Sequence, residues 1–426
     1  MVDMSAVPPA GPAVSLSRKS GRCSSSHPRS SARNASSSGV KAKSMRADAS
    51  ARNLTRALVF VAVDFALSAE QEALRDTVAA ALGAEAPISY VRRMIDVERG
   101  FTDELWAKVA DLGWLGLLVP EAHGGLGLGL VDLAVVQEEM GKALFPGPYL
   151  SSAVMATSAA LALGATDLLP ALAAGERRGT LALEELSQGD PLGGLTTTAV
   201  RSGDGWVLDG LKPVVLDGHT ADWAIVVAQA EGGLGAFLVE QPAAELVPTL
   251  DVTRKVARLE LRQTPARRLG PEGDQSGILR RVVDDVTVAL AAETVGACDQ
   301  AFREAVDYAQ HRVQFDRPIA RFQVIRHKAV DMLHELELAR VGILYTAWAS
   351  DVDDPQREMA VAMSKGFVGE ASVFITEQDI QIHGGMGFTW DVDAHLFYRR
   401  VKQNDLLLGH QAWHRQRLAD LVLASG

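Results

Sequence analysis

Cysteine is nearly absent from this sequence, aromatic residues are few, and long apolar runs are missing. The two cysteines, Cys23 and Cys298, lie far apart, which excludes a disulfide framework and favours a reducing compartment, so we expect a cytoplasmic protein. No apolar stretch approaches the ~18–20 residues that a membrane-spanning helix needs. Histidine and cysteine are scattered along the chain instead of lying at ligand spacing, so no metal site is expected.

A net positive charge is also lacking. The net charge of −11 argues against a nucleic-acid-binding protein, because neutralising a phosphate backbone needs a basic surface. What remains is a chain of 426 residues, 47% hydrophobic and 22% charged, which suits a globular protein of two or three domains.

Residues 1–62 differ from the remainder in composition. They are rich in Ser, Arg and Ala, and residues 1–56 contain ten Lys or Arg against only Asp3 and Asp48. Such a segment cannot bury enough apolar surface to offset its ordering entropy, so we expect a disordered basic extension. It has the composition of a transit-type presequence, or it is an extension from an upstream start codon, and we favour the second interpretation.

Residues 63–177 are predicted to form a helical domain. Ser68 and Gln71 make a capping-box pattern, and Thr102 can cap a second helix that ends before Gly113. Residues 115–120 have the pattern of a short extended piece. The glycine-rich run 124–129 lacks the spacing of a dinucleotide-binding loop and is interpreted as a structural turn.

Residues 178–272 are predicted to form a central antiparallel β domain, because short apolar runs alternate there with Asp-Gly, Gly-Gly and Pro turns. Helical periodicity returns in residues 273–426. We expect helices over 278–312, 322–350 and 355–383, and a last one beginning near Thr389. Helices, then strands, then helices, without βαβ alternation, indicate an α+β chain with a β insert.

Two segments of the C-terminal part carry the chemistry. Arg312 and Phe315 belong to a basic-aromatic run, and arginine binds phosphate bidentately while an aromatic ring can pack on an adenine. Gly384 and Gly385 lie between two helices, where backbone amides can approach a pyrophosphate, and Gln381 lies one turn earlier. Together these residues indicate a phosphate-bearing cofactor held between helices.

The segments 312–323 and 381–388 resemble the FAD-binding signature of the acyl-CoA dehydrogenase family. Further stretches that resemble the family are 111–121, 124–130 and 293–296, so the resemblance covers about residues 65–423. Residues 63–68 also resemble the usual opening of a family member, which is why we favour an extension before them.

The resemblance implies an N-terminal helical domain, a central β domain and a C-terminal four-helix bundle, with FAD bound between the last two. It implies a dimer or tetramer, because the family shares its cofactor across a subunit interface. Arg312 would meet the FAD pyrophosphate of a neighbouring subunit, and Phe315 and Gln323 would line its adenosine side. The pyrophosphate site would be closed by three further residues, namely Gln381, Gly384 and Gly385.

The family reaction implied is α,β-dehydrogenation of an acyl-CoA thioester, with a carboxylate as base and an electron-transfer flavoprotein as electron acceptor. Here the sequence departs from its relatives. The base of many relatives falls on Leu408, Gly409 or His410, and its second known location falls on Val286, none of which is a carboxylate. His410 and Glu293 remain as candidate catalytic residues, and Asp405 is a weaker third candidate.

The β domain departs as well. The family places a hydroxyl residue near the flavin after an apolar strand, where this chain has residues 181–186 without one, and a second flavin-contacting element corresponds to the apolar residues 214–216. Three hypotheses remain open. The chain is a self-sufficient dehydrogenase with an unusual base, a subunit of a heteromeric dehydrogenase for bulky steroid or branched acyl-CoA, or a non-catalytic scaffold that binds CoA or flavin.

Overall fold

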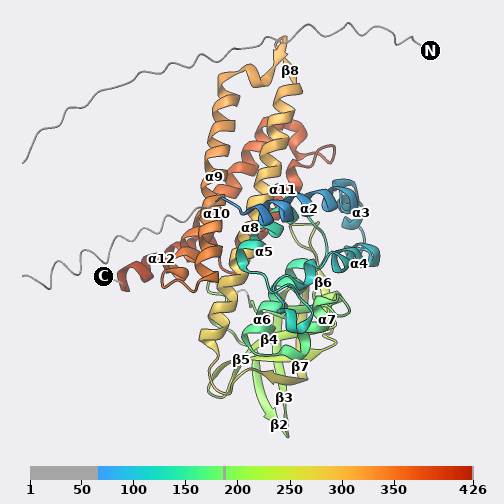
Figure 1. Ribbon diagram of the computed structural model, residues 1–426, viewed down its shortest axis with the longest axis vertical. Coiled ribbons are helices and arrows are strands. Elements are labelled where there is room, and N and C mark those ends of the chain that lie inside the picture. Colours follow the sequence, from blue (N-terminus) through green and yellow to red (C-terminus); the bar gives the residue numbers. More distant parts are fainter. Residues whose placement is uncertain (1–65, 186–188, 425–426) are drawn as a thin grey trace, which may run out of the picture. The chain divides into compact units, whose positions relative to one another are not determined.

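The computed structural model describes residues 66–185 and 189–424, so the expected basic extension 1–62 lies outside the described residues. The described chain begins with helices (Figure 1). Its N-terminal α-helices are α2 (Ala69–Glu85), α3 (Ile88–Ile95), α4 (Asp103–Asp111), α5 (Leu130–Lys142), α6 (Thr157–Ala162) and α7 (Leu169–Ala173). Shorter helical turns connect them: η1 (Trp114–Gly116), η2 (Glu121–His123), η3 (Tyr149–Ala156, a π-helix) and η4 (Thr166–Leu168).

Both predicted helix caps are confirmed. The hydroxyl of Ser68 accepts from the Gln71 amide at 3.2 Å while the Gln71 side chain accepts from the Ser68 amide at 3.0 Å. Thr102 accepts from the Leu105 amide at 3.3 Å at the start of α4. These side chains satisfy amides that have no partner within the helix.

The extended piece expected at 115–120 is wrong. This segment opens with the η1 turn, and the glycine-rich run 124–129 folds back along it: the amides of Leu126 and Leu128 donate to Gly116 and Leu117 at 2.9 and 2.8 Å. A Cβ on Gly125 would lie 2.1 Å from the carbonyl oxygen of Val119. The run is therefore a structural turn that needs glycine for close backbone approach, as interpreted from its spacing.

The central part is one sheet. Its strands are β1 (Gly179–Ala182), β2 (Thr198–Ser202), β3 (Gly205–Leu216), β4 (Trp223–Ala230), β5 (Gly233–Glu240), β6 (Ala244–Val247) and β7 (Val256–Leu269). They follow the order β1-β4-β2-β3-β7-β5, with β6 on β7, and β5 also pairs with β4, so the sheet closes on itself. Its pairings are antiparallel except those of β1 and β2 with β4.

Long helices make up the C-terminal part, and α8, α9, α10 and α11 form the expected four-helix bundle. The elements are α8 (Ser276–His311), β8 (Val313–Gln314), β9 (Arg317–Pro318), η6 (Ile319–Arg321), α9 (Gln323–Asp351), α10 (Arg357–His383), η7 (Gly384–Phe388), α11 (Ala394–Leu406) and α12 (Gln411–Ala424). The β8–β9 hairpin joins α8 to α9 (Figure 1). The last helix, expected as one element from near Thr389, is in fact two helices, because residues 407–410 form a loop between α11 and α12.

Two glycines bring the N-terminal helices onto the bundle. A Cβ on Gly141 of α5 would lie 1.9 Å from the carbonyl oxygen of Glu293 in α8, and one on Gly296 would lie 1.8 Å from that of Glu138. The two helices therefore touch backbone to backbone. Among the described residues, no helix is long and apolar enough to cross a membrane, and no group of three His, Cys, Asp or Glu is placed to hold a metal ion.

Candidate active site

The loop between α11 and α12 is strained at Leu408 and Gly409, two of the three positions at which the family resemblance leads us to expect the base. Leu408 has a φ of +59° and Gly409 one of +92°, and a branched side chain is rare in that region of φ. Two side chains hold Leu408 in place. Glu184, just after β1, accepts a hydrogen bond from its amide, and the Nε2 of His414 donates to its carbonyl oxygen at 2.9 Å.

Glu184 lies at the boundary of two cavities. The inner cavity has about 20 Å³ and apolar walls; besides Glu184, its lining residues are Leu150, Met155, Leu181, Leu183, Val214, Leu216, Leu290, Leu407 and Leu408. The main pocket has about 870 Å³ and is lined chiefly by residues 189–191, 213–214, 247–250 and 403–413. Glu184 is the single carboxylate that lines either space in the described part of the chain.

Burial among these apolar side chains raises the pKa of Glu184 to about 7, although the Leu408 amide and the ammonium of Lys365 favour the charged form. Lys365 of α10 is itself buried and donates to the carbonyl oxygen of Asn404 at 2.5 Å. Burial lowers the pKa of Lys365 to about 8, against the attraction of Asp405 and Glu184. The carboxyl group therefore titrates near neutral pH at the wall of a large pocket.

The main pocket has one flat wall and one unused donor. Trp413 of α12 fits between Gly189 and Gly409, where a Cβ would lie 2.9 and 2.5 Å from its atoms. Gln403 of α11 accepts from the Asp251 amide at 3.3 Å, but its Nε2 has no hydrogen-bond partner although the side chain is buried. A buried unpaired donor on a residue that lines a pocket is suited to a carbonyl group of a ligand.

His410, a candidate base from the sequence, lines the same pocket. Its Nε2 lies 3.1 Å from Oδ2 of buried Asp405, and its Nδ1 accepts from the Ala412 amide at 3.2 Å. Because both ring nitrogens have protein partners, the imidazole has no free lone pair for a substrate proton. Asp405, the weaker candidate, is occupied by His410 and by the amide of Gln411.

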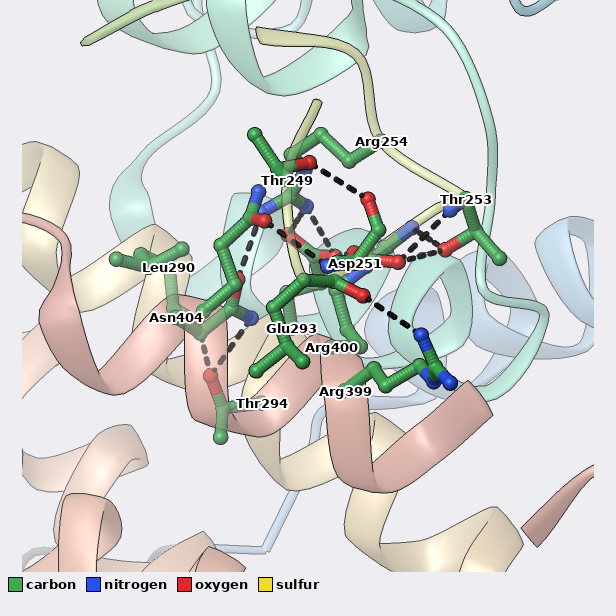
Figure 2. A network of polar contacts seen from close by, with 12 residues as sticks. Thr249, Asp251, Thr253, Arg254, Leu290, Glu293, Thr294, Arg399, Arg400 and Asn404 are labelled. Carbon is green, nitrogen blue, oxygen red and sulfur yellow. Dashed lines mark hydrogen bonds and ion pairs between the residues drawn. The ribbon is translucent and has the colours of Figure 1, made fainter. Parts of the chain in front are cut away.

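Glu293, the other candidate base, lies in a buried ion-pair network (Figure 2). Arg254 donates to both of its oxygens and Arg400 donates to Oε1 at 2.5 Å. Arg400 also pairs with Asp251 and donates to Thr253 at 2.7 Å. Burial alone would raise the pKa of Glu293, but the two guanidinium groups hold it below its ordinary value. This geometry ties α8 and α11 to the 251–254 loop and favours a structural role.

The residues expected at the cofactor's phosphate end lie elsewhere on the bundle. Arg312 ends α8 and is exposed, Gln323 opens α9 and is exposed, and Phe315 is 85% exposed on the hairpin between them. Phe315 packs edge-on against Phe322 with 6.1 Å between ring centroids. None of the three lines the main pocket.

Gln381, Gly384 and Gly385 line a third space, the terminal pocket, of about 770 Å³. Lys328 also lines it, and Gly384 has a φ of +63° with ψ −139°, which only glycine adopts readily. The ends of α8 and α10 meet here, because the Tyr308 ring lies 4.3 Å from that of His383. The glycine pair and the turn before Arg312 are thus neighbours.

Sequence reasoning missed Glu184. In the sequence, the stretch 181–186 differs from the family pattern by its lack of a hydroxyl. Two adjacent acidic residues directly after the apolar run 181–183 are the available signal, because an acidic side chain at such a position is either paired or functional. Its neighbour Glu185 is paired, with 2.6 Å between Oε1 and Nζ of Lys212.

Comparisons with known proteins agree with this fold. Residues 68–176 match the model of the acyl-CoA dehydrogenase N-terminal domain and residues 283–423 that of the C-terminal domain. Acyl-CoA dehydrogenase IpdE2 of Mycobacterium tuberculosis is 33% identical over 80% of this chain and 93% of its own length. The solved Tcur3481–Tcur3483 steroid ACAD is 32% identical over 84% of this chain and 98% of that one, with a TM-score of 0.76.

A further solved structure, the ChsE4–ChsE5 complex from Mycobacterium tuberculosis, is 26% identical over 85% of this chain and 99% of that one, with a TM-score of 0.77. Both domain models, and a relative that is 33% identical along most of its length, indicate the same family. The chain therefore belongs to the acyl-CoA dehydrogenase family, whose members are flavoprotein oxidoreductases that act on CH–CH bonds.

Proposed function

We propose that this protein catalyses the flavin-dependent α,β-dehydrogenation of an acyl-CoA thioester, with FAD as cofactor and an electron-transfer flavoprotein as electron acceptor. The observation that carries the proposal is the main pocket, which joins a flat apolar wall, an unpaired amide donor and one carboxylate in a space of about 870 Å³. A pocket of this size and lining suits a ring system with a few carbonyl groups.

The terminal pocket fits the phosphate end of FAD. A Cβ on Gly384 or Gly385 would meet nothing within 4 Å, so neither glycine is required by packing inside the chain, although the Gly384 amide already donates to the carbonyl oxygen of Gln381. Lys328 and Gln381 line the pocket, and Arg312 ends the neighbouring helix. Cationic and amide side chains around a glycine pair that leaves space for a ligand are groups suited to binding phosphate.

The main and terminal pockets share no lining residue, so we ask whether one cofactor molecule uses pockets from two subunits. We infer that one FAD uses the main pocket of one subunit and the Arg312 end of another. The functional unit is then a homodimer or homotetramer, or a heterotetramer with a paralogous subunit. The exposure of Phe315 on the hairpin agrees with a role toward a second chain.

FAD would supply the hydride acceptor for the β-hydrogen of the substrate. The chain's own residues bind and orient the reactants: Trp413 and Val214 offer apolar faces, Gln403 Nε2 donates to a carbonyl group, and the 407–410 loop closes one side. Apolar walls exclude water and strengthen each polar contact that remains.

A second candidate function is that of one subunit in a heteromeric acyl-CoA dehydrogenase. It is favoured by the missing carboxylate at 408–410 and by two similar structures whose descriptions each name two components. In that arrangement this chain contributes half of the FAD site and its partner contributes the base.

One experiment tests both. The protein is purified alone and again after co-expression with a paralogue, its flavin absorbance is recorded, and a panel of acyl-CoA esters is screened with an artificial electron acceptor. Yellow protein that reduces the dye alone supports the first function. Colour and activity only with the paralogue support the second, and a colourless, inactive protein that binds CoA contradicts both and leaves a scaffold.

A further inference from the structure

We propose that Glu184, and not a residue of the 408–410 loop, is the base that removes the α-proton of the acyl-CoA substrate. This inference rests on the proposed dehydrogenation and assigns its proton acceptor to the segment after β1. The catalytic carboxylate then approaches the substrate from the sheet side of the pocket.

Position is the first argument. In the part of the chain that the structure describes, no other Asp or Glu lines the inner cavity or the main pocket. The two main candidates drawn from the sequence are engaged elsewhere, His410 by Asp405 and an amide, and Glu293 by two arginines. Glu184 is the remaining group that can accept a proton from a ligand there.

Orientation is the second argument. One carboxylate oxygen, Oε1, accepts from the amide of Leu408, and the other, Oε2, has no partner among the described residues. The side chain is thus fixed through one atom and free at the other, which is the arrangement that a general base needs.

The electrostatic surroundings are the third argument. The charged groups that face Glu184 are few: Lys365 from α10 favours the carboxylate, and His410 lies on the loop across the main pocket. Glu185 turns away to Lys212, so it adds little repulsion. Burial brings the pKa of Glu184 to about 7, close to the pH at which a general base is most effective.

The step is a proton transfer. The Cα–H bond of the thioester breaks, an O–H bond forms at Oε2 of Glu184, and the electron pair stays on the substrate as the thioester enolate. The β-hydrogen leaves with its electron pair to an oxidised flavin, which is the oxidant of the proposed function. Glu184 later releases its proton to solvent through the main pocket.

The test uses the full chain loaded with FAD and three substitutions. Glu184→Gln keeps an acceptor for the Leu408 amide but removes the base, Glu184→Asp keeps a base on a shorter arm, and Glu184→Ala removes both. We expect Glu184→Gln to lower kcat by about 10²–10⁴-fold with an unchanged melting temperature, and Glu184→Asp to recover part of the activity. A matched control is Glu304→Gln, because burial also raises the pKa of Glu304 to about 7 but it lines neither space.

A second readout follows the proton without turnover. Exchange of the substrate α-hydrogen for deuterium in D2O, with no electron acceptor, is measured by mass spectrometry, and it should be lost in Glu184→Gln and kept in Glu304→Gln. If the wild-type protein is active and Glu184→Gln keeps both full turnover and full exchange, Glu184 is not the base. The proposed function is unaffected by that result. A wild-type chain with neither turnover nor exchange, alone or with a paralogue, overturns both.

Discussion

Arg400 of α11 and Glu293 of α8 form a salt bridge of 2.5 Å in which the two side chains are 0% and 3% exposed. Arg254 and Asp251 complete the set, so two guanidinium groups face two carboxylates away from water (Figure 2). Each charge depends on the others, because an unpaired charge at this depth is costly. The network explains why an acidic residue stands on the buried face of α8 without acting as a base.

Glu293→Gln should therefore act on stability. Loss of one partner from a buried pair costs on the order of 3–5 kcal/mol, and urea unfolding measures it. Arg201→Ala is the control, because its pair with Glu272 is 59% and 71% exposed and such surface pairs contribute at most about 1 kcal/mol. A Glu293→Gln protein of wild-type stability that has lost turnover would instead return Glu293 to the catalytic candidates.

Gly384 and Gly385 form a matched pair for testing the terminal pocket. Both have open space where a Cβ would stand, but only Gly384 has a positive φ. Gly384→Ala should lower stability by about 1–3 kcal/mol through backbone strain. Gly385→Ala should leave the melting temperature unchanged and weaken FAD binding, since the new methyl group occupies the ligand's space. Equal FAD affinity in wild type and Gly385→Ala would contradict the binding of the FAD phosphates in this pocket.

Arg312 should contribute to FAD affinity without contributing to the fold, because its side chain is exposed and has no ion pair among those of the described residues. Loss of a charge-assisted hydrogen bond costs about 1.5–3 kcal/mol, so Arg312→Ala should weaken FAD binding by roughly 10–100-fold. Fluorescence titration of the apoprotein measures this. Arg303→Ala, on the same helix with a pair to Asp299, is the control, and a similar loss in both variants would mean a general charge effect.

His414 makes the 407–410 loop sensitive to acid. Burial and the nearby Lys365 lower its pKa to about 3, so the folded state keeps the ring neutral while the unfolded chain takes up a proton below its ordinary value. The stabilising contribution is complete above pH 6.5 and falls by about 1.4 kcal/mol per pH unit below it. Urea unfolding across this range should show a shallower pH dependence for His414→Gln, which keeps a donor for Leu408. Identical slopes would show that the histidine is protonated in the fold.

Much of the fold can be predicted from the sequence, because the helices are specified by residues close together in the chain. The Ser68 and Thr102 caps and the long apolar periods of α8, α9 and α10 specify helices from neighbouring residues alone. Strand β7 is harder, since it has many charged residues and alternates between buried and exposed positions against β3. The η1 turn was mispredicted because its partners come from the glycine run that follows it.

The site was only partly readable for a related reason. The motif residues Arg312, Gln381 and Gly384 stand out by type and spacing. The role of Glu184 depends on Leu408, more than two hundred residues later, and on the walls that surround its carboxyl group. The bonds that occupy His410 and Glu293 are likewise tertiary. No sequence pattern reports which carboxylate remains free after the chain has folded.

The most direct measurement is the pH dependence of acyl-CoA-driven dye reduction by the FAD-loaded chain, in wild type and in Glu184→Gln. The account predicts that wild-type turnover rises with pH through an ionisation near 7, because Glu184 must be charged to accept a proton. It predicts that Glu184→Gln loses most of the activity and that the remaining activity no longer rises with pH near 7. The same rate and the same rise with pH in both proteins would contradict it.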